Sequence, residues 1–409
     1  MKYILIIGDG MADNAVPELG GVTPLDYLDK PAMDALAGAG TMGSVKTCPD
    51  GLPPGSDTAI LSIFGCDPRV CYTGRAPLEA AATGLTLAAG DIAYRCNMVA
   101  LEDGDADFGE LRILSHSAGS IEGDASETLV SALFADAAFA SLAARAGMRV
   151  YPARSFRHIA VQSGASAEGL TLAPPHNYLG EKIGALLPSG SENAAVLRGL
   201  MEASHEFLDH HPINEARRAA RKMPANCIWF WAEGTAVSLP NFAERYGKTG
   251  AVVSAVPLCH GIARLIGLGV AEVPGATGEL DTNYAGKVDA AIEILREHPF
   301  AAVHIEAPDE CTHNGDLPGK LEAIRRLDSL VVAPLTERLR ASGEDFRVLI
   351  LSDHKTLTST RGHDGEPVPY LLYDSRFDRK TGLRCRELDG ELANYVPDGT
   401  RLMGLLFEA

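Results

Sequence analysis

Six short runs of apolar residues, separated by polar segments, have the length and composition of buried β-strands. Three of them are strong: Tyr3–Ile7, Ala301–Glu306 and Arg347–Leu351. Three are weaker: Ile228–Trp231, Ala251–Val256 and Met403–Phe407. Between these runs, apolar residues recur at three- and four-residue steps, which is the spacing of a helix that buries one face. This alternation predicts an α/β protein with a mainly parallel sheet flanked by helices.

The clearest predicted helix covers Lys320–Ala341, and Gly343 follows it as a C-terminal stop. A second helix is predicted over Lys287–Glu297. The middle third of the chain reads differently, with a polar, glycine-rich segment at 104–120 and a loop of small residues and prolines at 163–175. We therefore expect a core domain of residues 1–75 and 237–409, interrupted by a smaller inserted α/β domain of residues 76–236.

Composition and charge limit which partners the protein can bind and which cellular compartment suits it. The chain has 409 residues and a formal net charge of −18, so its field repels nucleic acid and anionic lipid. An anionic substrate would then need a local positive centre, such as metal ions or a few arginines. No apolar stretch reaches the roughly 18 residues of a membrane span. The eight cysteines form no CxxC pair, which favours free thiols in a reducing cytoplasm.

The three strong strands lead directly into acidic or imidazole side chains. Asp9 follows the first, Asp309 follows the second, and Asp353 with His354 follows the third. Because ligands bind outside the carboxyl ends of parallel strands, these side chains should converge on one crevice. Carboxylates that close repel one another, so bound metal ions are expected between them.

Two further histidines fit a metal centre. His313 lies four residues after Asp309, which puts both on one face of a helical turn, and His363 follows in a loop. Six ligands are too many for one closed structural zinc site and suit two divalent ions with open positions. Mixed carboxylate and imidazole ligands suit Mn²⁺, Zn²⁺ or Fe²⁺, and suit Mg²⁺ or Ca²⁺ less well.

A candidate nucleophile comes from the segment Leu52-Pro-Pro-Gly-Ser-Asp-Thr-Ala59. Ser56 follows the Pro-Pro-Gly turn and precedes a helix-like run over Thr58–Phe64. A serine at this position is either an N-cap or a nucleophile. As a nucleophile it would have a hydroxyl activated by a metal ion and a helix N-terminus to receive a phosphoryl group.

The order of these motifs resembles the alkaline phosphatase superfamily, and more narrowly the cofactor-independent phosphoglycerate mutases of the short, archaeal type. The resemblance extends over the whole chain and includes Tyr72-Thr-Gly-Arg-Ala-Pro-Leu-Glu-Ala80 and His304-Ile-Glu-Ala-Pro-Asp-Glu310. It implies two metal ions, usually Mn²⁺. One would be held by Asp309, His313 and His363, and the other by Asp9, Ser56, Asp353 and His354.

The resemblance also implies a reaction. Ser56 would take the phosphoryl group of a phosphoglycerate and return it to the other hydroxyl of the reoriented glycerate, which interconverts 3- and 2-phosphoglycerate. The inserted domain would act as a lid that holds the substrate carboxylate and keeps water from hydrolysing the phosphoserine.

The chain departs from this family where the substrate is bound. An Asp-Arg-Ser-Ala-Gly-Arg-Ile-like segment of the family reads Ser-His-Ser-Ala-Gly-Ser-Ile at 115–121, so both arginines are missing. A usual Lys-Gly-Ile begins here with His260. The remaining candidates for binding a small phosphorylated or hydroxylated acid are Arg75, His116, Arg157 and His260.

Three alternatives stay open. A related branch is proposed to phosphorylate homoserine, although no P-loop sequence for a nucleotide occurs. A phosphatase would release free phosphate through a leaky lid. A metal-stabilised binding protein would have kept the fold and lost the reaction. The sequence does not indicate an oligomeric state.

Overall fold

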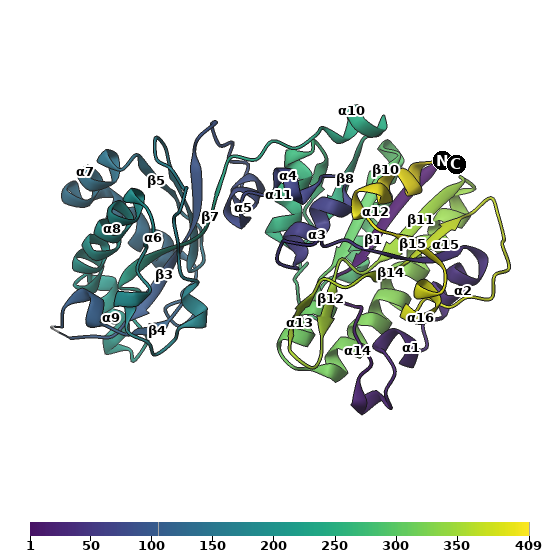
Figure 1. Cartoon of the computed structure of the whole chain (residues 1–409), viewed down its shortest axis with the longest axis horizontal. Helices are drawn as coiled ribbons and strands as arrows, with labels where there is room; N and C mark the ends of the chain where they lie inside the picture. Colours follow the sequence, from purple (N-terminus) through teal and green to yellow (C-terminus); the bar gives the residue numbers. More distant parts are fainter. Residues whose placement is uncertain (105, 409) are drawn as a thin grey trace. The chain divides into compact units, whose positions relative to one another are not determined.

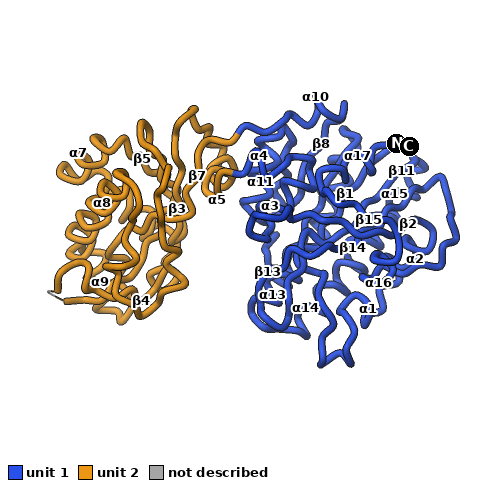
Figure 2. The backbone as a smooth tube through the Cα atoms, in the orientation of Figure 1, with its two compact units in different colours: residues 1–72, 238–409 blue, residues 73–237 orange. Residues whose placement is uncertain are grey.

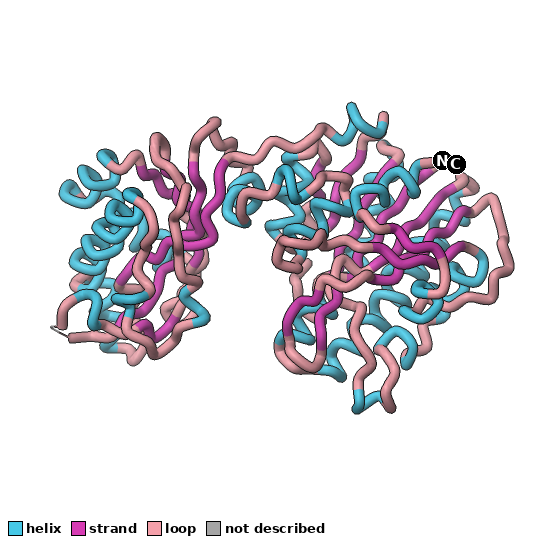
Figure 3. The backbone as a smooth tube through the Cα atoms, viewed as in Figure 1, coloured by secondary structure: helices cyan, strands magenta, loops and turns pink. Residues whose placement is uncertain are grey.

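The computed structural model describes residues 1–104 and 106–408, and the chain forms two compact units. Unit 1 joins residues 1–72 to residues 238–409, and unit 2 is residues 73–237 (Figure 2). Both units combine helices with strands (Figure 3). Unit 2 is therefore an insertion between two sequence-distant parts of unit 1.

Unit 1 is built on an eight-stranded sheet (Figure 1). Its strands, in spatial order, are β15 (Asn394–Val396), β2 (Thr41–Val45), β14 (Val368–Asp374), β11 (Phe346–Leu351), β1 (Lys2–Gly8), β10 (Phe300–Ile305), β8 (Gly250–Val253) and β9 (Gly269–Ala271). Only β14 runs antiparallel to its neighbours. The prediction of a mainly parallel sheet is confirmed, with the three strong strands side by side at its centre.

Helices surround this sheet and supply the apolar core of unit 1. For example, α12 contacts β10 and β8, while α2 contacts β14. The helices of unit 1 are α1 (Pro24–Tyr27), α2 (Pro31–Ala39), α3 (Ser56–Ile63), α4 (Pro68–Cys71), α10 (Phe242–Tyr246), α11 (Pro257–Leu265), α12 (Tyr284–Glu297), α13 (Ala307–His313), α14 (Leu317–Arg326), α15 (Ala333–Ser342), α16 (Glu387–Glu391) and α17 (Leu402–Phe407). A small hairpin of β12 (Lys355–Leu357) and β13 (Gly362–Asp364) completes the unit.

The long helix predicted over 320–341 is helical throughout but not uniform. A π-helical turn, Leu327–Val332, separates α14 from α15. Pro334 at the start of α15 has no N–H to give to a regular ladder, which accounts for a local change of hydrogen bonding there. Within the turn, the buried Asp328 accepts hydrogen bonds from the Ala32 and Met33 N–H groups at the start of α2. Gly343 ends α15 at φ 72°, as predicted.

One weak strand prediction is wrong. The run Met403–Phe407 lies in helix α17. Asp398 accepts the Thr400 N–H and starts a 3₁₀ turn that leads straight into this helix. An apolar run of five or six residues is too short to show whether its period is that of a strand or of a helix. The other weak runs form β7 and β8, although β8 ends at Val253 rather than at Val256.

Unit 2 is an antiparallel sheet covered by helices. Its strands are β3 (Ile92–Leu101), β4 (Ile113–Ser115), β5 (Met148–Tyr151), β6 (Arg157–Gln162) and β7 (Cys227–Thr235). Its helices are α5 (Arg75–Ala82), α6 (Asp124–Ala135), α7 (Ala137–Arg145), α8 (Glu192–Asp209) and α9 (Pro212–Ala219). One side of the sheet packs against α6 and α8, and α5 covers residues such as Ala93 and Ile159 on the other.

Among the described residues, no single helix is long and apolar enough to cross a membrane. Only α6 and α7 taken together reach the length and composition of a span, and they are bent by 76° where they meet. All eight cysteines are free, and seven of them are buried.

Candidate active site

The carboxyl ends of the three central strands bring the predicted acidic residues together. Asp9 follows β1, Asp309 lies in the first turn of α13 after β10, and Asp353 follows β11. The strands are parallel and in register, with Gly8 opposite Ile305 and Ile7 opposite Leu351. All three carboxylates are buried. We call these residues, together with Ser56, His313, His354 and His363, the carboxylate–histidine cluster.

One half of the cluster is formed by Asp309, His313 and His363, whose ligand atoms lie within 4.8 Å of one another. The Nε2 atoms of the two histidines are 2.9 Å apart. Nε2 of His313 is 3.0 Å from Asp309 Oδ2, and Nε2 of His363 is 3.5 Å from Asp309 Oδ1. These three side chains therefore point at a common centre.

The other half contains Asp9, Asp309 and His354, whose ligand atoms also lie within 4.8 Å of one another. His354 Nε2 is 3.5 Å from Asp9 Oδ1 and 3.2 Å from Asp353 Oδ2. Asp309 thus belongs to both halves.

The hydrogen bonds of the imidazoles fix which nitrogen faces the centre. Nδ1 of His313 lies 2.8 Å from the Arg361 carbonyl oxygen, which can only accept, so Nδ1 carries the proton. Nδ1 of His354 likewise faces the Lys355 carbonyl oxygen, at 3.3 Å. In the neutral rings, both Nε2 lone pairs then point at carboxylate oxygens. Lone pairs and carboxylates gathered in this way form a site for cations.

Main-chain and side-chain donors anchor the carboxylates. Asp353 Oδ1 accepts the N–H groups of Gly10 and His354, at 3.1 and 2.9 Å. Asp309 Oδ1 accepts the Thr356 hydroxyl at 2.6 Å. The other oxygen of Asp353 and Oδ1 of Asp9 are buried without any hydrogen-bond partner among the described residues. Buried unpaired carboxylate oxygens are costly unless a cation meets them, so the residues present fit the binding of divalent metal ions.

The electrostatics of the cluster support this conclusion. Burial, with repulsion from Asp353 and Asp309, raises the pKa of Asp9 well above its usual range. Burial also acts to raise the pKa of Asp309, but hydrogen bonds from His313 and His363 outweigh it and hold that pKa well below its usual range. The bond to Asp309 raises the pKa of His313 to about 9. A divalent cation would compete with that proton for the same lone pair.

Ser56 occupies the first position of α3, after the Gly55 cap. Its Oγ lies 3.1 Å from His354 Nε2 and 3.4 Å from Asp9 Oδ2. The side chain is half-buried, so its hydroxyl reaches the cluster without being sealed from ligands. The helix N-terminus adds unpaired N–H groups and the positive end of the dipole beside the hydroxyl.

Several supporting residues were missed by the sequence analysis. His304 in β10 contacts Asp9, and Thr356 in β12 contacts Asp309. The fully buried Lys320 reaches Asp13 Oδ2 at 2.8 Å and the Thr356 carbonyl at 2.6 Å. Polar side chains inside runs that otherwise form buried elements were the only signal, and Lys320 was assigned simply to a helix.

The structure places the four predicted substrate-binding residues in two groups. His260 belongs to unit 1, on α11, and its Nε2 donates to the Ser254 carbonyl at 2.8 Å. Arg75, His116 and Arg157 belong to unit 2. Ser254 therefore connects His260 to His304, because its hydroxyl also forms a hydrogen bond with the His304 imidazole.

In unit 2, arginines gather on the side of the sheet that α5 covers. Arg95 lies opposite Trp231 on β7, and Arg157 lies opposite Asn97 on β3. Arg95 forms a two-pronged ion pair with Glu79 of α5, and Arg75 Nε approaches the same carboxylate at 3.1 Å. Burial raises the pKa of Glu79, but Arg95 and the neighbouring arginines reverse this and lower it to about 2.

Arg157 differs from the other two. Its guanidinium lies 5.2 Å from the Phe156 ring centre and 5.7 Å from that of Trp231, and its Nε is buried without a hydrogen-bond partner in the described chain. Burial and the nearby Arg95 lower the pKa of Arg157 to about 10, so it stays charged at neutral pH. The His116 and His176 rings lie in the same aromatic group. This arrangement is typical of an arginine that is held in place by aromatic rings and whose N–H groups can still donate hydrogen bonds to an anion.

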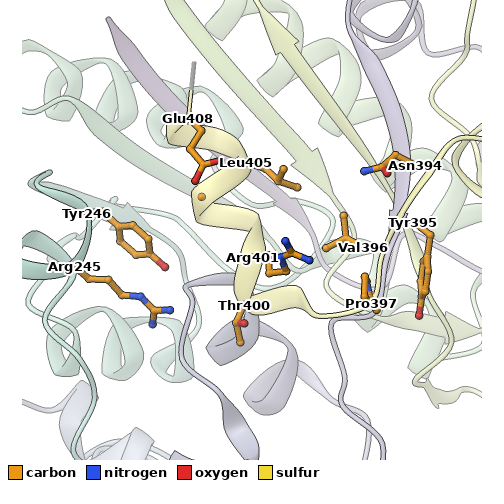
Figure 4. Close-up of a pocket in the computed structure, with 11 residues that line it drawn as sticks. Arg245, Tyr246, Asn394, Tyr395, Val396, Pro397, Thr400, Arg401, Leu405 and Glu408 are labelled. Atoms are coloured by element: carbon orange, nitrogen blue, oxygen red, sulfur yellow. The ribbon is translucent and has the colours of Figure 1, made fainter.

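Unit 1 also has a cavity of about 460 Å³, which none of the residues of the carboxylate–histidine cluster lines (Figure 4). Its lining includes Arg245, Tyr246, Tyr395, Arg401 and Glu408. The walls come from α10, β15, the segment that leads into α17, and α17 itself. The candidate chemistry is therefore carried by the cluster at the strand ends and not by this cavity.

Comparisons with known proteins agree with the geometry. A family model described as 2,3-bisphosphoglycerate-independent phosphoglycerate mutase matches residues 37–214. The protein of that name from Methanosarcina acetivorans is 45% identical over 91% of this chain and 90% of its own. A probable enzyme of the same name from Geobacter sulfurreducens is 41% identical over the full length of both chains.

Solved structures show the same relationship. The PH0037 protein from Pyrococcus horikoshii matches 100% of this chain and 97% of its own with a TM-score of 0.79 and 29% identity. A cofactor-independent phosphoglycerate mutase from Thermoplasma acidophilum matches 100% and 99%, with a TM-score of 0.65 and 25% identity. With this fold, this cluster and relatives this similar along nearly the whole chain, the protein belongs to the 2,3-bisphosphoglycerate-independent phosphoglycerate mutase family.

Proposed function

We propose that the protein interconverts 3-phosphoglycerate and 2-phosphoglycerate by moving a phosphoryl group through Ser56, with two divalent metal ions, Mn²⁺ by preference. The observation that carries the proposal is the position of the Ser56 hydroxyl at the start of α3, 3.1 Å from His354 Nε2 and 3.4 Å from Asp9 Oδ2. Eight free thiols suit the reducing cytoplasm, where we place this reaction.

The cluster divides the work between binding and nucleophilic attack. Asp309, His313 and His363 would hold one ion, and Asp9, Asp353 and His354 the other. When bound, such ions supply positive charge that lowers the pKa of a serine hydroxyl and neutralises a phosphate. N–H groups at the start of α3 would donate hydrogen bonds to the phosphoryl oxygens.

Two matched half-reactions follow. Ser56 Oγ bonds to phosphorus while the bond from phosphorus to the C3 oxygen breaks; the serine loses a proton and the departing oxygen gains one. Glycerate then presents its C2 hydroxyl, which bonds to phosphorus as the bond to Oγ breaks. The proton count is restored, and no nucleotide or second phosphate donor is consumed.

We propose that unit 2 is the substrate-binding domain and that Arg157, with Arg75 and His116, binds the substrate carboxylate. Arg157 supports this because its charge is held by aromatic rings and is paired with no carboxylate in the described chain. Segment 115–121, where the family's two arginines are missing, contributes His116 to the same aromatic group. Recognition in this chain would therefore rest on Arg157.

A second candidate function is phosphoryl transfer from a nucleotide to a small hydroxylated acid such as homoserine. The absence of arginine from 115–121 favours it, since an altered anion site can accompany an altered substrate. It would use the same serine and metal-binding residues. The two functions differ in their need for a phosphate donor, which an assay can detect.

The role of Ser56 is tested by substitution. We expect Ser56→Ala to lose at least about 10³-fold in turnover, because no other residue forms the covalent intermediate. Wild-type protein quenched in acid during turnover should yield a peptide phosphorylated at Ser56 by mass spectrometry. Ser62→Ala, a buried hydroxyl on the same helix, is the matched control and should stay active. An active Ser56→Ala enzyme would refute the mechanism.

A further inference from the structure

The imidazole of His304 bridges the metal-binding residue Asp9 and the end of a neighbouring strand. His304 lies in β10 and is 2% exposed. Its Nε2 is 2.9 Å from Asp9 Oδ2, and its Nδ1 is 3.1 Å from the Ser254 hydroxyl, just after β8. We propose that His304 is a positioning residue that aims the second oxygen of Asp9 at the cation. This inference rests on the proposed function, since it assigns a role toward the same metal centre.

Proton counting fixes the direction of this chain of hydrogen bonds. Asp9 as a carboxylate can only accept, so His304 Nε2 must carry the proton. In the neutral ring Nδ1 then holds a lone pair, and the Ser254 hydroxyl must donate to it. Ser254 Oγ in turn accepts the Val256 N–H at 3.0 Å. Both His304 ring nitrogens and the Ser254 hydroxyl are therefore hydrogen-bonded. Only the other Asp9 oxygen, Oδ1, has no hydrogen-bond partner among the described residues.

Asp9 depends on this support more than the other two carboxylates do. Asp353 is anchored by two main-chain N–H groups, which any sequence would supply. Asp309 is anchored by the Thr356 hydroxyl and bonded by His313. For Asp9, the side-chain anchors in the described chain are His304 and, at the longer distance of 3.4 Å, the nucleophile Ser56. Repulsion from Asp353 and Asp309 would turn an unanchored Asp9 away from the centre.

The same geometry rules out a more direct role. Nε2 of His304 carries the proton that it donates to Asp9, and the lone pair on Nδ1 accepts the Ser254 hydroxyl, so no ring lone pair is free for a metal ion. His304 therefore acts through Asp9. Groups that orient a metal-binding side chain commonly contribute 10–100-fold to metal affinity.

The test is a titration of the full-length, metal-depleted protein with Mn²⁺. The electron paramagnetic resonance signal of free Mn²⁺ reports how much of the ion is bound. His304→Leu removes the donor, whereas His304→Gln can place an amide N–H near the Nε2 position. We expect His304→Leu to weaken one of two sites by about 10–100-fold and leave the other unchanged. We expect His304→Gln to stay within about threefold of wild type at both sites. Circular dichroism and the thermal midpoint check folding.

Two further variants sharpen the result. Ser254→Ala keeps the ring but frees Nδ1, and should weaken the same single site even if His304→Leu fails to fold. His298→Leu is the matched control: this imidazole bonds the Thr249 hydroxyl at the opposite end of β10, at 2.9 Å, and its loss should not alter Mn²⁺ binding.

The outcomes separate this inference from the function beneath it. If wild type binds two Mn²⁺ and His304→Leu binds them equally well, the positioning role is wrong and the proposed function stands. Equal weakening of both sites, or equal loss in His304→Gln and His304→Leu, would also overturn it by indicating a merely structural role. If wild type binds no divalent ion at all, both proposals fail.

Discussion

At the scale of single residues, the two charged centres of this protein are held in opposite ways. In the carboxylate–histidine cluster, Asp9 and Asp353 are each anchored through one oxygen, and the other oxygen of each has no hydrogen-bond partner in the described chain. Arg157 in unit 2 is held by aromatic rings that leave guanidinium N–H groups free of ion pairs in the described chain. One centre therefore lacks positive charge and the other lacks negative charge. In the proposed function, a metal ion would supply the first and an anionic substrate the second.

Arg157 offers a prediction at this scale. We expect Arg157→Gln to raise KM for 3-phosphoglycerate at least tenfold, because an amide cannot replace the charged, two-pronged donor. The effect on kcat should be smaller if the contact forms equally in the ground and transition states. Steady-state kinetics measure both values. The matched control is Arg149→Gln on β5, an exposed arginine that lies 3.7 Å from Asp91. Equal KM values for wild type and Arg157→Gln would contradict the assignment.

At the scale of elements, the turn after β1 controls how closely the strand ends approach. Gly10 has φ 60°, and a Cβ there would overlap the Thr356 hydroxyl and lie 2.8 Å from Asp309 Oδ1. These are the groups that hold both halves of the cluster together. A side chain at this position must displace the Thr356 hydroxyl and the Asp309 carboxylate, which glycine avoids.

The corresponding prediction compares two glycines. Gly10→Ala should weaken Mn²⁺ binding and lower activity by at least tenfold, and should destabilise the fold by about 1–3 kcal/mol. Gly20→Ala is the control, because Gly20 has a similar φ of 78° but open space around its Cβ position. Urea unfolding and Mn²⁺ titration report the two effects. If Gly10→Ala behaves like Gly20→Ala, crowding at the cluster is not what requires glycine there.

The elements that place the cluster could be predicted because their signals are local. The three central strands are continuous apolar runs, as expected for strands buried on both faces, and each leads into its acidic residue. Strands β2, β14 and β15 were not predicted. They are short or have mixed polarity, and they owe their strand structure to pairing with distant partners, as β2 does with both β14 and β15. Helix α17 was misassigned for a different reason: five apolar residues are too few to distinguish the period of a helix from that of a strand.

At the scale of the whole molecule, sequence order and chemistry together specified the candidate site. Asp9, Asp309 and Asp353 are up to 344 positions apart in the chain, yet their placement at strand ends implied that they meet. His304 could not be found in this way, because its contacts with Asp9 after β1 and with Ser254 after β8 depend on the pairing of β10 with both strands. The pairing of Arg95 with Glu79 was also invisible, since it requires α5 to lie on the unit 2 sheet.

The division into two units bears on how a protein with a net charge of −18 could bind an anionic substrate. Such a field repels a phosphorylated acid, so binding must come from concentrated positive charge. Unit 1 would obtain it from metal ions at the cluster, and unit 2 has it in Arg75, Arg95 and Arg157. Each unit thus carries one of the two features that an anionic substrate needs.

The most direct test of this account is phosphorus NMR of the Mn²⁺-loaded protein with 3-phosphoglycerate as the only phosphate compound. We predict that the resonance of 2-phosphoglycerate grows in without free phosphate, and that Ser56→Ala produces neither. Accumulation of free phosphate would indicate a phosphatase. No conversion, together with formation of O-phosphohomoserine when ATP and homoserine are supplied, would contradict the mutase and show that the same serine serves a different substrate.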